Sequence, residues 1–542
     1  MAGQLSTEQV LLLNNLMYMK EEGPFPAVVN HPGESVGNLL GQIDVNAIDP
    51  NKDYGSFITG KDWINIINAV KNDPELSSYQ IASTNVDHAE GGGGGGSALF
   101  VNPDTNEAVV AFRGTAGGEW KDNFIGGGPT DMPDGVSTQQ QQNALEWYQS
   151  LNPDQYSNVT VTGHSKGGNK AKYITVKDDS VDQCISFDGQ GFSDEFMEKY
   201  KDEISMRQDK ISNNNVESDY VNLLLNDIGD TTYYEGHDYG KGKFLENHSP
   251  NTFFQFHKDG SFSLNEGTRD PRMAQVDEFL NSYLRSLPAD KKREALNMVG
   301  ELVETGFSND PDMMNSLLDI LLEGNNVDNV GYLAAYLVEY IDKNPGFQDV
   351  INGVLKDMEL DDITKIVDVV VNITQWKYFD ELVDVVSWGS DKIPNLLYDL
   401  LRKWLAEKGI ELSNDDLRKF MSVFQSLDRS LDKVNVNQNG SDHAVNTGAG
   451  KAIFQVSLSA LEKAGEDLAE IKRQMEDCMQ SVDRLAGQTR LKAFSMLIVR
   501  QRLELVENRL EVEGKKCLKL KKSLGEIHEE YRKTETGLVE QF

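Results

Sequence analysis

The pattern of apolar and polar positions changes along this chain. Up to about residue 265, short apolar or β-branched runs alternate with amphipathic stretches of helical period, and glycine-rich turns separate them. The helical spacing falls at residues 6–20, 61–70, 137–150 and 194–207, and the strand pattern at residues 79–86, 98–101, 108–112, 158–162, 183–187 and 219–227. Alternating strands and helices predict an α/β fold with a doubly wound, mostly parallel sheet.

Beyond residue 265 the period becomes helical throughout. Residues 266–432 predict an all-helical middle region, residues 433–452 a polar linker, and residues 453–542 a long helical hairpin that turns at residues 486–489. A pair of helices cannot enclose a core alone, so the apolar stripes of this hairpin should be covered by helical partner proteins.

One turn in the first region carries a serine between glycines. The sequence Gly163-His-Ser165-Lys-Gly167 lies where a strand ends and a helix begins. This is the context of a nucleophile elbow, in which a strained serine is exposed and its glycine neighbours let strand and helix approach closely. Ser165 is therefore the predicted nucleophile; the plainer alternative is a glycine-rich turn with an idle serine.

An earlier strand ends in Phe112-Arg-Gly-Thr115. A serine hydrolase needs two backbone N–H donors for its oxyanion, one after the nucleophile and one from a loop that follows an earlier strand. Lys166 and Thr115 fit these two places, although a structural turn with a paired arginine would explain the same residues. The glycine-rich residues 116–136 carry Trp120 and Phe124, and they predict a lid beside the site.

The acid and the base of a triad should follow the nucleophile. The predicted strand that starts at Asp219 runs into a polar turn, where Asp227 is the chosen acid. His248, on a Ser-Pro turn before an aromatic run, is the chosen base. Several alternatives remain open, namely Asp188, Asp230 and Asp238 for the acid and His237 and His257 for the base.

Composition excludes several classes of function. The formal net charge of −35 argues against nucleic acid as a partner. Three cysteines (Cys184, Cys478 and Cys517) are too few for a disulfide framework, and neither a membrane span nor an ordinary signal peptide is indicated. No metal and no cofactor is expected.

The motifs Val109-Val-Ala-Phe-Arg-Gly-Thr115, Gly163-His-Ser165, the turn at Asp227 and Asn247-His248-Ser together resemble the class 3 lipase branch of the α/β-hydrolases. The resemblance covers roughly residues 1–260, and residues 1–265 are predicted to form the catalytic domain. It implies that Ser165 is the nucleophile, Asp227 the acid and His248 the base, with Thr115 and Lys166 as the oxyanion hole, and it implies glycerophospholipid or another acyl ester as substrate. One departure is that Gly229-Asp230 replaces the apolar-proline continuation usual after the acid.

The C-terminal hairpin resembles the WXG and LXG targeting modules of type VII secretion, and Tyr531 with Glu535 matches the spacing of that pathway's export motif. The order of the two parts resembles reversed type VII lipase effectors. It implies an antibacterial lipase that is made in the cytoplasm, secreted without a cleaved signal peptide and active at membrane lipids. Its expected partners are small helical WXG- or LXG-associated proteins and an immunity protein. The alternatives are a non-catalytic adaptor with a hydrolase-like fold, and an acyltransferase or thioesterase with the same triad.

Overall fold

The computed structural model of this chain describes only part of its 542 residues. The described residues are 4–21, 23–86, 96–115, 120–223, 225–237, 245–258, 261–306, 316, 320, 326–357, 372 and 401–406. The chain divides into two compact units, Met1–Gly440 and Ser441–Phe542, and all described residues belong to the first. The predicted linker, the helical hairpin and the pair Tyr531 and Glu535 lie outside the described residues. Residues on both sides of the predicted boundary at 265 belong to the same unit.

The predicted α/β architecture is confirmed by a seven-stranded sheet whose strands follow one another in sequence order. Its strands are β1 Gln80–Val86, β2 Gly96–Val101, β3 Glu107–Phe112, β4 Asn158–His164, β5 Gln183–Phe187, β6 Ile211–Val216 and β7 Asp230–Tyr234. The first three strands pair antiparallel, and β3 to β7 pair in parallel. Because the carboxyl ends of parallel strands meet at one edge of a sheet, the segments that follow β4, β5 and β6 lie together there.

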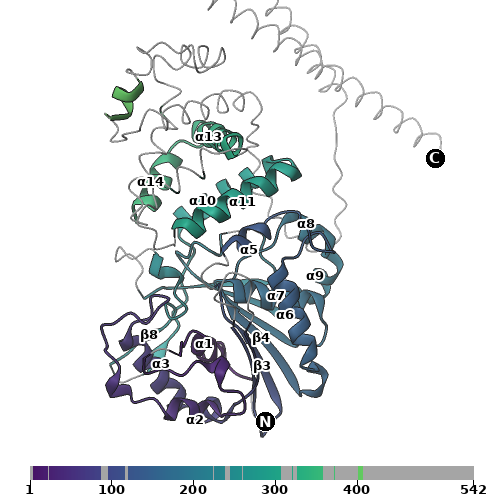
Figure 1. Cartoon of the computed structure of the whole chain (residues 1–542), viewed down its shortest axis with the longest axis vertical. Helices are drawn as coiled ribbons and strands as arrows, with labels where there is room; N and C mark the ends of the chain where they lie inside the picture. The colour runs from purple at the N-terminus through teal and green to yellow at the C-terminus, as the bar shows by residue number, and fades with distance from the viewer. Residues whose placement is uncertain are drawn as a thin grey trace, which may run out of the picture. The chain divides into compact units, whose positions relative to one another are not determined.

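Helices cover both faces of this sheet (Figure 1). The helices α1 Thr7–Leu16 and α3 Gly60–Asn72 bury their apolar residues on one face, and α6 Gln139–Ser150 and α7 Lys166–Lys177 cover the other. The helices α1, α3 and α6 each begin with a capping box, at Ser6, Thr59 and Thr138, which satisfies backbone N–H groups at the helix start. The remaining short helices are α2 Val36–Gly41, α4 Pro74–Ser78, α5 Trp120–Ile125, α8 Asp194–Lys199 and α9 Lys201–Arg207, and a two-stranded sheet joins β8 Gln255–Phe256 to β9 Phe262–Ser263.

The sequence prediction placed one strand wrongly. The strand lies at β6, with the sequence Ile-Ser-Asn-Asn-Asn-Val, and the described residues 219–223 and 225–227 contain no strand. Asparagine is disfavoured in strands, so the pattern of apolar residues pointed to the later segment. Tertiary hydrogen bonds occupy donors of two of the buried amides here: Asn213 Nδ2 donates to the carbonyl of Ile228 at 2.8 Å, and Asn214 Nδ2 to that of Ser186 at 3.3 Å.

The described part of the middle region is helical, as predicted. It contains α10 Pro271–Ser286, α11 Ala289–Gly306, α13 Asn326–Lys343 and α14 Phe347–Asp357. Aromatic side chains form much of its core, and Leu223 from the loop after β6 packs into the same cluster. The helices α5 and α11 are in contact, so the middle region packs directly on the α/β domain. Among the described residues, no helix is long and apolar enough to cross a membrane.

Candidate active site

Ser165 stands at the sharp turn between β4 and α7. Its φ is 59° and its ψ is −127°, a strained conformation for a residue with a side chain. The neighbouring glycines are required by space: a Cβ at Gly163 would lie 2.1 Å from the carbonyl carbon of Gly167, and a Cβ at Gly167 would lie 2.0 Å from the carbonyl oxygen of Phe112. Strand β4, helix α7 and the end of β3 therefore approach one another closely only because these two positions lack side chains.

His248 links this serine to a buried carboxylate. Its Nε2 lies 2.8 Å from Ser165 Oγ, and its Nδ1 lies 2.6 Å from Asp219 Oδ1. Asp219 is buried, and its second oxygen accepts the backbone N–H groups of Val221 at 3.1 Å and Asn222 at 2.9 Å. The imidazole thus stands between a hydroxyl and a fixed carboxylate, which is the arrangement of a Ser-His-Asp triad.

The loop that carries His248 is held from two other segments. His248 ends a short 3-10 helix, Leu245–His248, and the hydroxyl of the next residue, Ser249, donates to the carbonyl of Ser56 at 2.7 Å. The carbonyl of Pro250 accepts a hydrogen bond of 2.9 Å from Asn15 Nδ2, near the end of α1. Both bonds hold the chain just after His248, so contacts with distant segments help to orient the ring.

The choice of Asp227 as the acid is wrong in this geometry. Its carboxylate pairs with Lys172 Nζ, whose side chain is fully buried and which also donates to the carbonyl of Gly189 at 3.0 Å. Asp227 lies just before β7, whose first residue Asp230 pairs with Ser212 near the start of β6. Asp219 instead follows the carboxyl end of β6 by three residues, on the same edge as Ser165.

The other candidates occupy different places. The ring of His237 contacts the carbonyl of Thr252 through Nδ1 at 3.2 Å, and His257 is exposed at the end of β8. Asp230 is exposed at the start of β7, and Asp238 lies outside the described residues. The signal that could have identified Asp219 is its position just beyond a strand, but that strand consists largely of asparagine.

Asp188 lies beside Asp219 but has another role in the geometry. Its Oδ1 accepts the N–H of Val216 at 2.7 Å and the amide of Asn222 at 3.3 Å, so it ties together the two ends of the loop that holds Asp219. Burial and the neighbouring charge of Asp219 raise the pKa of Asp188 well above its ordinary value. The carboxyl of Asp188 therefore favours its neutral form, and Asp219 is the carboxylate that contacts His248.

His164 adds a second ring behind the catalytic histidine. The ring centroids of His164 and His248 lie 4.7 Å apart. Tyr18, from the segment after α1, accepts the N–H of Gly114 at 3.1 Å, and its hydroxyl lies 2.6 Å from His164 Nδ1. Burial, and then the charge of the nearby His248, lower the pKa of His164 well below its ordinary value. The adjacent imidazole is therefore neutral and leaves His248 as the ring that can accept a proton.

The two predicted oxyanion residues lie on either side of the serine. Lys166 is the first residue of α7, where backbone N–H groups lack an acceptor within the helix. Thr115 lines the same cavity as Ser165, and its hydroxyl accepts a hydrogen bond of 2.8 Å from Asn123 Nδ2. The backbone of this loop is anchored one residue earlier, at Gly114, by the hydroxyl of Tyr18. Thr115 thus lines the cavity that Ser165 lines, and Lys166 follows the serine directly; their role as oxyanion donors stays a prediction.

Part of the predicted lid is a helix, α5, that is held from two sides. The side chain of Lys166, 1% exposed, pairs with Asp122 at 2.8 Å. From α11, Glu304 accepts the N–H of Trp120 at 2.9 Å and Glu301 pairs with Lys121 at 3.1 Å. Residues 116–119 lie outside the described residues. The described part of the segment is thus tied both to the serine helix and to the middle region.

A cavity of about 160 Å³ opens above the serine. Its polar floor is formed by Ser165, His248, His164 and Thr115, and its walls include Trp120, Tyr220 and Phe57. Phe57 is 40% exposed and has a φ of 59°. The apolar rim around a polar floor suits a substrate that combines a hydrocarbon chain with a reactive polar group.

The buried cluster was also tested as a metal site. His164, Asp188 and His248 each place one possible ligand atom within 4.8 Å of the others. Both nitrogens of His248 already have partners, in Ser165 and Asp219, and Nδ1 of His164 has Tyr18. Only Nε2 of His164 and Oδ2 of Asp188 remain buried without a protein partner. Two ligands are fewer than the three or four protein ligands of a zinc site, so the described cluster does not fit one.

Parts of this chain are similar to one protein family and to solved structures of lipases. The family described as Mbeg1-like matches residues 96–300, which include Ser165, Asp219 and His248. Two solved structures are similar to the chain, both of them fungal lipases. Lip2 lipase from Yarrowia lipolytica is 13% identical with a TM-score of 0.27, and the match covers 42% of this chain and 77% of that one. A triacylglycerol lipase from Penicillium expansum is 12% identical with a TM-score of 0.21, covering 29% and 70%. No curated protein matches the chain.

The parallel sheet, the strained serine after β4 and the histidine–aspartate pair are together those of an α/β-hydrolase domain.

Proposed function

We propose that this chain is a lipase-type carboxylic ester hydrolase that uses Ser165, His248 and Asp219. The observation that carries the proposal is the chain of two short contacts, 2.8 Å from Ser165 Oγ to His248 Nε2 and 2.6 Å from His248 Nδ1 to Asp219 Oδ1. Activation of a serine hydroxyl requires a base within hydrogen-bond distance and a third group that orients the base. The match to the Mbeg1-like family over residues 96–300 and the apolar rim of the cavity also support it.

In the proposed reaction, Ser165 Oγ attacks the acyl carbon and its proton passes to His248 Nε2. Asp219 holds the ring so that Nε2 faces the serine, and its charge stabilises the imidazolium. The imidazolium then gives the proton to the leaving alcohol, which leaves an acyl-serine. A water molecule, deprotonated by His248, attacks the acyl-serine and releases the carboxylic acid with Ser165 restored.

The backbone N–H groups of Lys166 and Thr115 are proposed to stabilise the oxyanion of each tetrahedral intermediate. Lys166 lies at the start of α7, where the helix dipole also favours negative charge. Each such donor contributes about 10²–10³-fold to the rate in serine hydrolases. The Tyr18–Gly114 hydrogen bond holds the second loop in place.

Glycerophospholipid is the proposed substrate, supported by the resemblance of the sequence motifs to class 3 lipases and by the apolar rim of the cavity. Mass spectrometry of a panel of phospholipids and acylglycerols, incubated with the full chain and with Ser165→Ala, tests the assignment. We expect free fatty acid and lysolipid from the unaltered chain alone. Equal product from both proteins would contradict the serine mechanism.

The alternative functions are separated by two simple measurements. A fluorophosphonate probe should label Ser165 in the native chain and not in Ser165→Ala, because labelling requires an activated serine. An unlabelled native protein would favour a non-catalytic adaptor. If added alcohol or thiol acceptors divert most of the acyl group from water, an acyltransferase is indicated in place of a hydrolase.

Export through a type VII pathway as an antibacterial effector is proposed from the sequence alone. Its support is the periodicity of residues 453–542 and the spacing of Tyr531 and Glu535. Two variants test this, the deletion of residues 453–542 and the substitution Tyr531→Ala. Each should abolish release from a producing cell that has such a pathway, while ester hydrolysis in the lysate persists. Undiminished release of both variants would contradict the proposal.

A further inference from the structure

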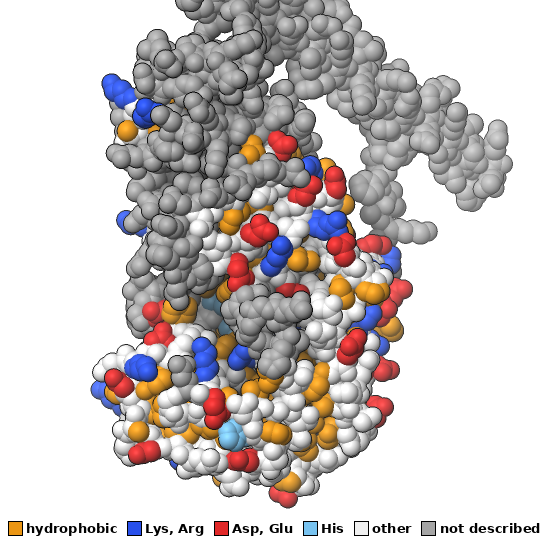
Figure 2. Space-filling view, viewed as in Figure 1, with side chains coloured by type: hydrophobic (Ala, Val, Ile, Leu, Met, Phe, Trp, Pro, Cys, Tyr) orange, Lys and Arg blue, Asp and Glu red, His pale blue; other side chains and the backbone are white. Residues whose placement is uncertain are grey.

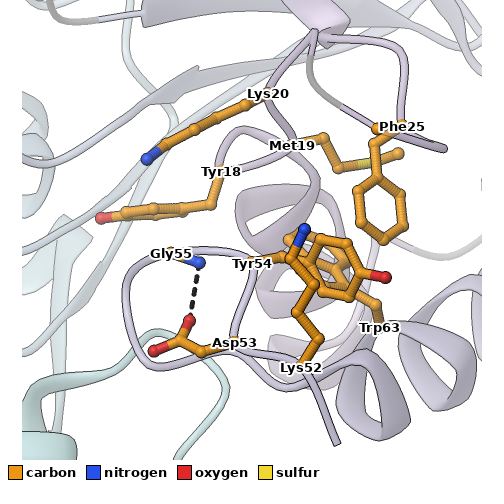
Figure 3. A pocket seen from close by; sticks show the side chains of 10 residues that line it. Tyr18, Met19, Lys20, Phe25, Lys52, Asp53, Tyr54, Gly55 and Trp63 are labelled. Atoms are coloured by element: carbon orange, nitrogen blue, oxygen red, sulfur yellow. Dashed lines mark hydrogen bonds between the residues drawn. The ribbon is translucent and has the colours of Figure 1, made fainter. Parts of the chain in front are cut away.

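A second cavity, of about 260 Å³, lies next to the catalytic one. Figure 3 shows its lining from close by: the ammonium ends of Lys20 and Lys52 lie apart, and the rings of Phe25, Tyr54 and Trp63 lie close to one another. Trp63 is buried, whereas both lysines are exposed. The cavity therefore combines an aromatic base with cationic side chains that a ligand can reach from solvent.

The two cavities share a wall. Tyr18, whose hydroxyl contacts His164 beside the triad, lines both of them. The loop of residues 52–57 also passes from one to the other, because Lys52 to Gly55 line the second cavity and Ser56 and Phe57 line the catalytic one. Three successive positive φ values, 102° at Gly55, 56° at Ser56 and 59° at Phe57, turn the chain at the point where the cavities meet.

The charges in the second cavity favour an anion. Within the ranges that the structure describes, neither Lys20 nor Lys52 forms an ion pair with a carboxylate. Lys20 Nζ lies against Gly55, where a Cβ would be 2.8 Å from it, and Lys52 Nζ stands 4.9 Å from the centroid of the Tyr54 ring. Among the described residues that line the cavity, Asp53 carries the one carboxylate, and it accepts the N–H of Gly55 at 2.6 Å. Two ammonium groups against one carboxylate leave a local positive charge.

This local charge contrasts with the rest of the chain, whose formal net charge is −35. In Figure 2, acidic side chains are scattered over the visible face with basic ones between them. An acidic protein repels an anionic membrane surface at long range, so binding of an anionic lipid needs cations close to the active site. The second cavity, which shares the lining residue Tyr18 with the catalytic cavity, provides two of them.

We propose that Lys20 and Lys52 bind the phosphate of a phospholipid headgroup while the acyl ester of the same molecule lies at Ser165. The inference rests on the proposed ester hydrolase function and names the part of the site that selects its substrate. The phosphate of a glycerophospholipid is only a few bonds from its esters, which matches two cavities with a common wall. A quaternary ammonium is not the group recognised here, because Lys52 already occupies the face of Tyr54.

Kinetics of the double variant K20Q/K52Q test the inference. The measured quantity is the ratio of kcat/KM for phosphatidylglycerol to kcat/KM for diacylglycerol with the same acyl chains, both in neutral detergent micelles. We expect this ratio to fall about tenfold, mainly through KM, since each exposed charge pair contributes modestly. The matched control is K61Q/K71Q, which removes the same charge from exposed positions of α3 outside both cavities and should leave the ratio unchanged.

A binding measurement separates this inference from the hydrolase proposal. Because a binding measurement needs no turnover, it uses the Ser165→Ala chain. This protein is titrated with glycerophosphoglycerol, the soluble headgroup without acyl chains. We expect saturable binding that weakens with added salt and that is lost when K20Q/K52Q is introduced. If glycerophosphoglycerol binds but the unaltered chain hydrolyses no lipid, the anion site is supported and the hydrolase proposal is contradicted. If K20Q/K52Q hydrolyses lipid with an unchanged ratio of kcat/KM values, the headgroup site is contradicted and the hydrolase proposal stands.

Inorganic phosphate carries the same anionic group as a phospholipid headgroup and is the other ligand to compare. Inorganic phosphate is titrated into the same proteins as a parallel arm. Weaker binding of inorganic phosphate than of glycerophosphoglycerol is the expected result, because the aromatic walls add contacts to the glycerol. If inorganic phosphate binds more tightly and K20Q/K52Q leaves the lipid ratio unaltered, the cavity is a phosphate-ion site and the headgroup assignment is wrong.

Discussion

Asp219 Oδ1 and His248 Nδ1 lie 2.6 Å apart although they are 29 positions apart in the chain. The carboxylate reaches the ring because the loop after β6 opens at the same sheet edge as the serine turn after β4. Its second oxygen is occupied by two backbone N–H groups, so the carboxylate cannot rotate away from the histidine.

This relationship predicts different effects for two aspartate substitutions. Asp219→Asn should lower kcat about 10³–10⁴-fold with little change in stability, because an amide stabilises the imidazolium far less than a carboxylate. Asp227→Asn should keep the activity but destabilise the fold by roughly 3 kcal/mol, since the buried ammonium of Lys172 loses its counter-charge. Ester kinetics and urea unfolding measure the two effects. Loss of activity in Asp227→Asn without loss of stability would contradict the assignment of the acid.

The strained backbone of Ser165 predicts a gain in stability when its side chain is removed entirely. Ser165→Gly should be inactive, yet more stable than the equally inactive Ser165→Ala by about 1 kcal/mol, because glycine adopts a positive φ without strain. Thermal unfolding of both proteins makes the comparison. The same exchange at Ser186, an ordinary position inside β5, is the control and should not favour glycine.

Buried His164 predicts a loss of stability in acid. Its folded pKa is lowered, so below pH about 6.5 the unfolded chain binds a proton that the native chain does not, and stability falls as the pH falls. His164→Asn removes this group while its Oδ1 can still accept a hydrogen bond from Tyr18. We expect the slope of the free energy of unfolding against pH to be shallower in His164→Asn, by up to about 1.4 kcal/mol per pH unit. Identical slopes in both proteins would show that His164 titrates normally.

The raised pKa of Asp188 predicts that its charge is dispensable. Asp188→Asn should retain most of the activity at neutral pH, because an amide resembles the neutral carboxyl and its oxygen still accepts from Val216 and Asn222. Asp188→Leu removes the oxygen that accepts both hydrogen bonds, loosens the loop that holds Asp219 and should lower kcat. Steady-state kinetics from pH 6 to 8 compare the two. A large loss in Asp188→Asn would mean that Asp188 is ionised and acts on the triad by charge.

The local features of the site could be predicted from the sequence. The glycines around Ser165 identify the turn because the close approach of β4 and α7 depends on near neighbours in the chain. Thr115 and Lys166 could be selected for a similar reason, since Thr115 lies in the loop after a strand and Lys166 directly follows the nucleophile. His248 could be selected from three histidines by its turn and the aromatic run behind it.

The acid and the second cavity were decided by tertiary structure. Asp219 is the partner of His248 because β6 ends at Val216, and a strand of buried asparagines is stable only through hydrogen bonds to distant carbonyls such as that of Ile228. Lys20 and Lys52 line one cavity for a similar reason, since the segment after α1 and the loop before α3 both border it. Local sequence thus determines which backbone turn can expose a nucleophile. The partners that meet it depend on strand ends and loop contacts that are set by packing across the whole domain.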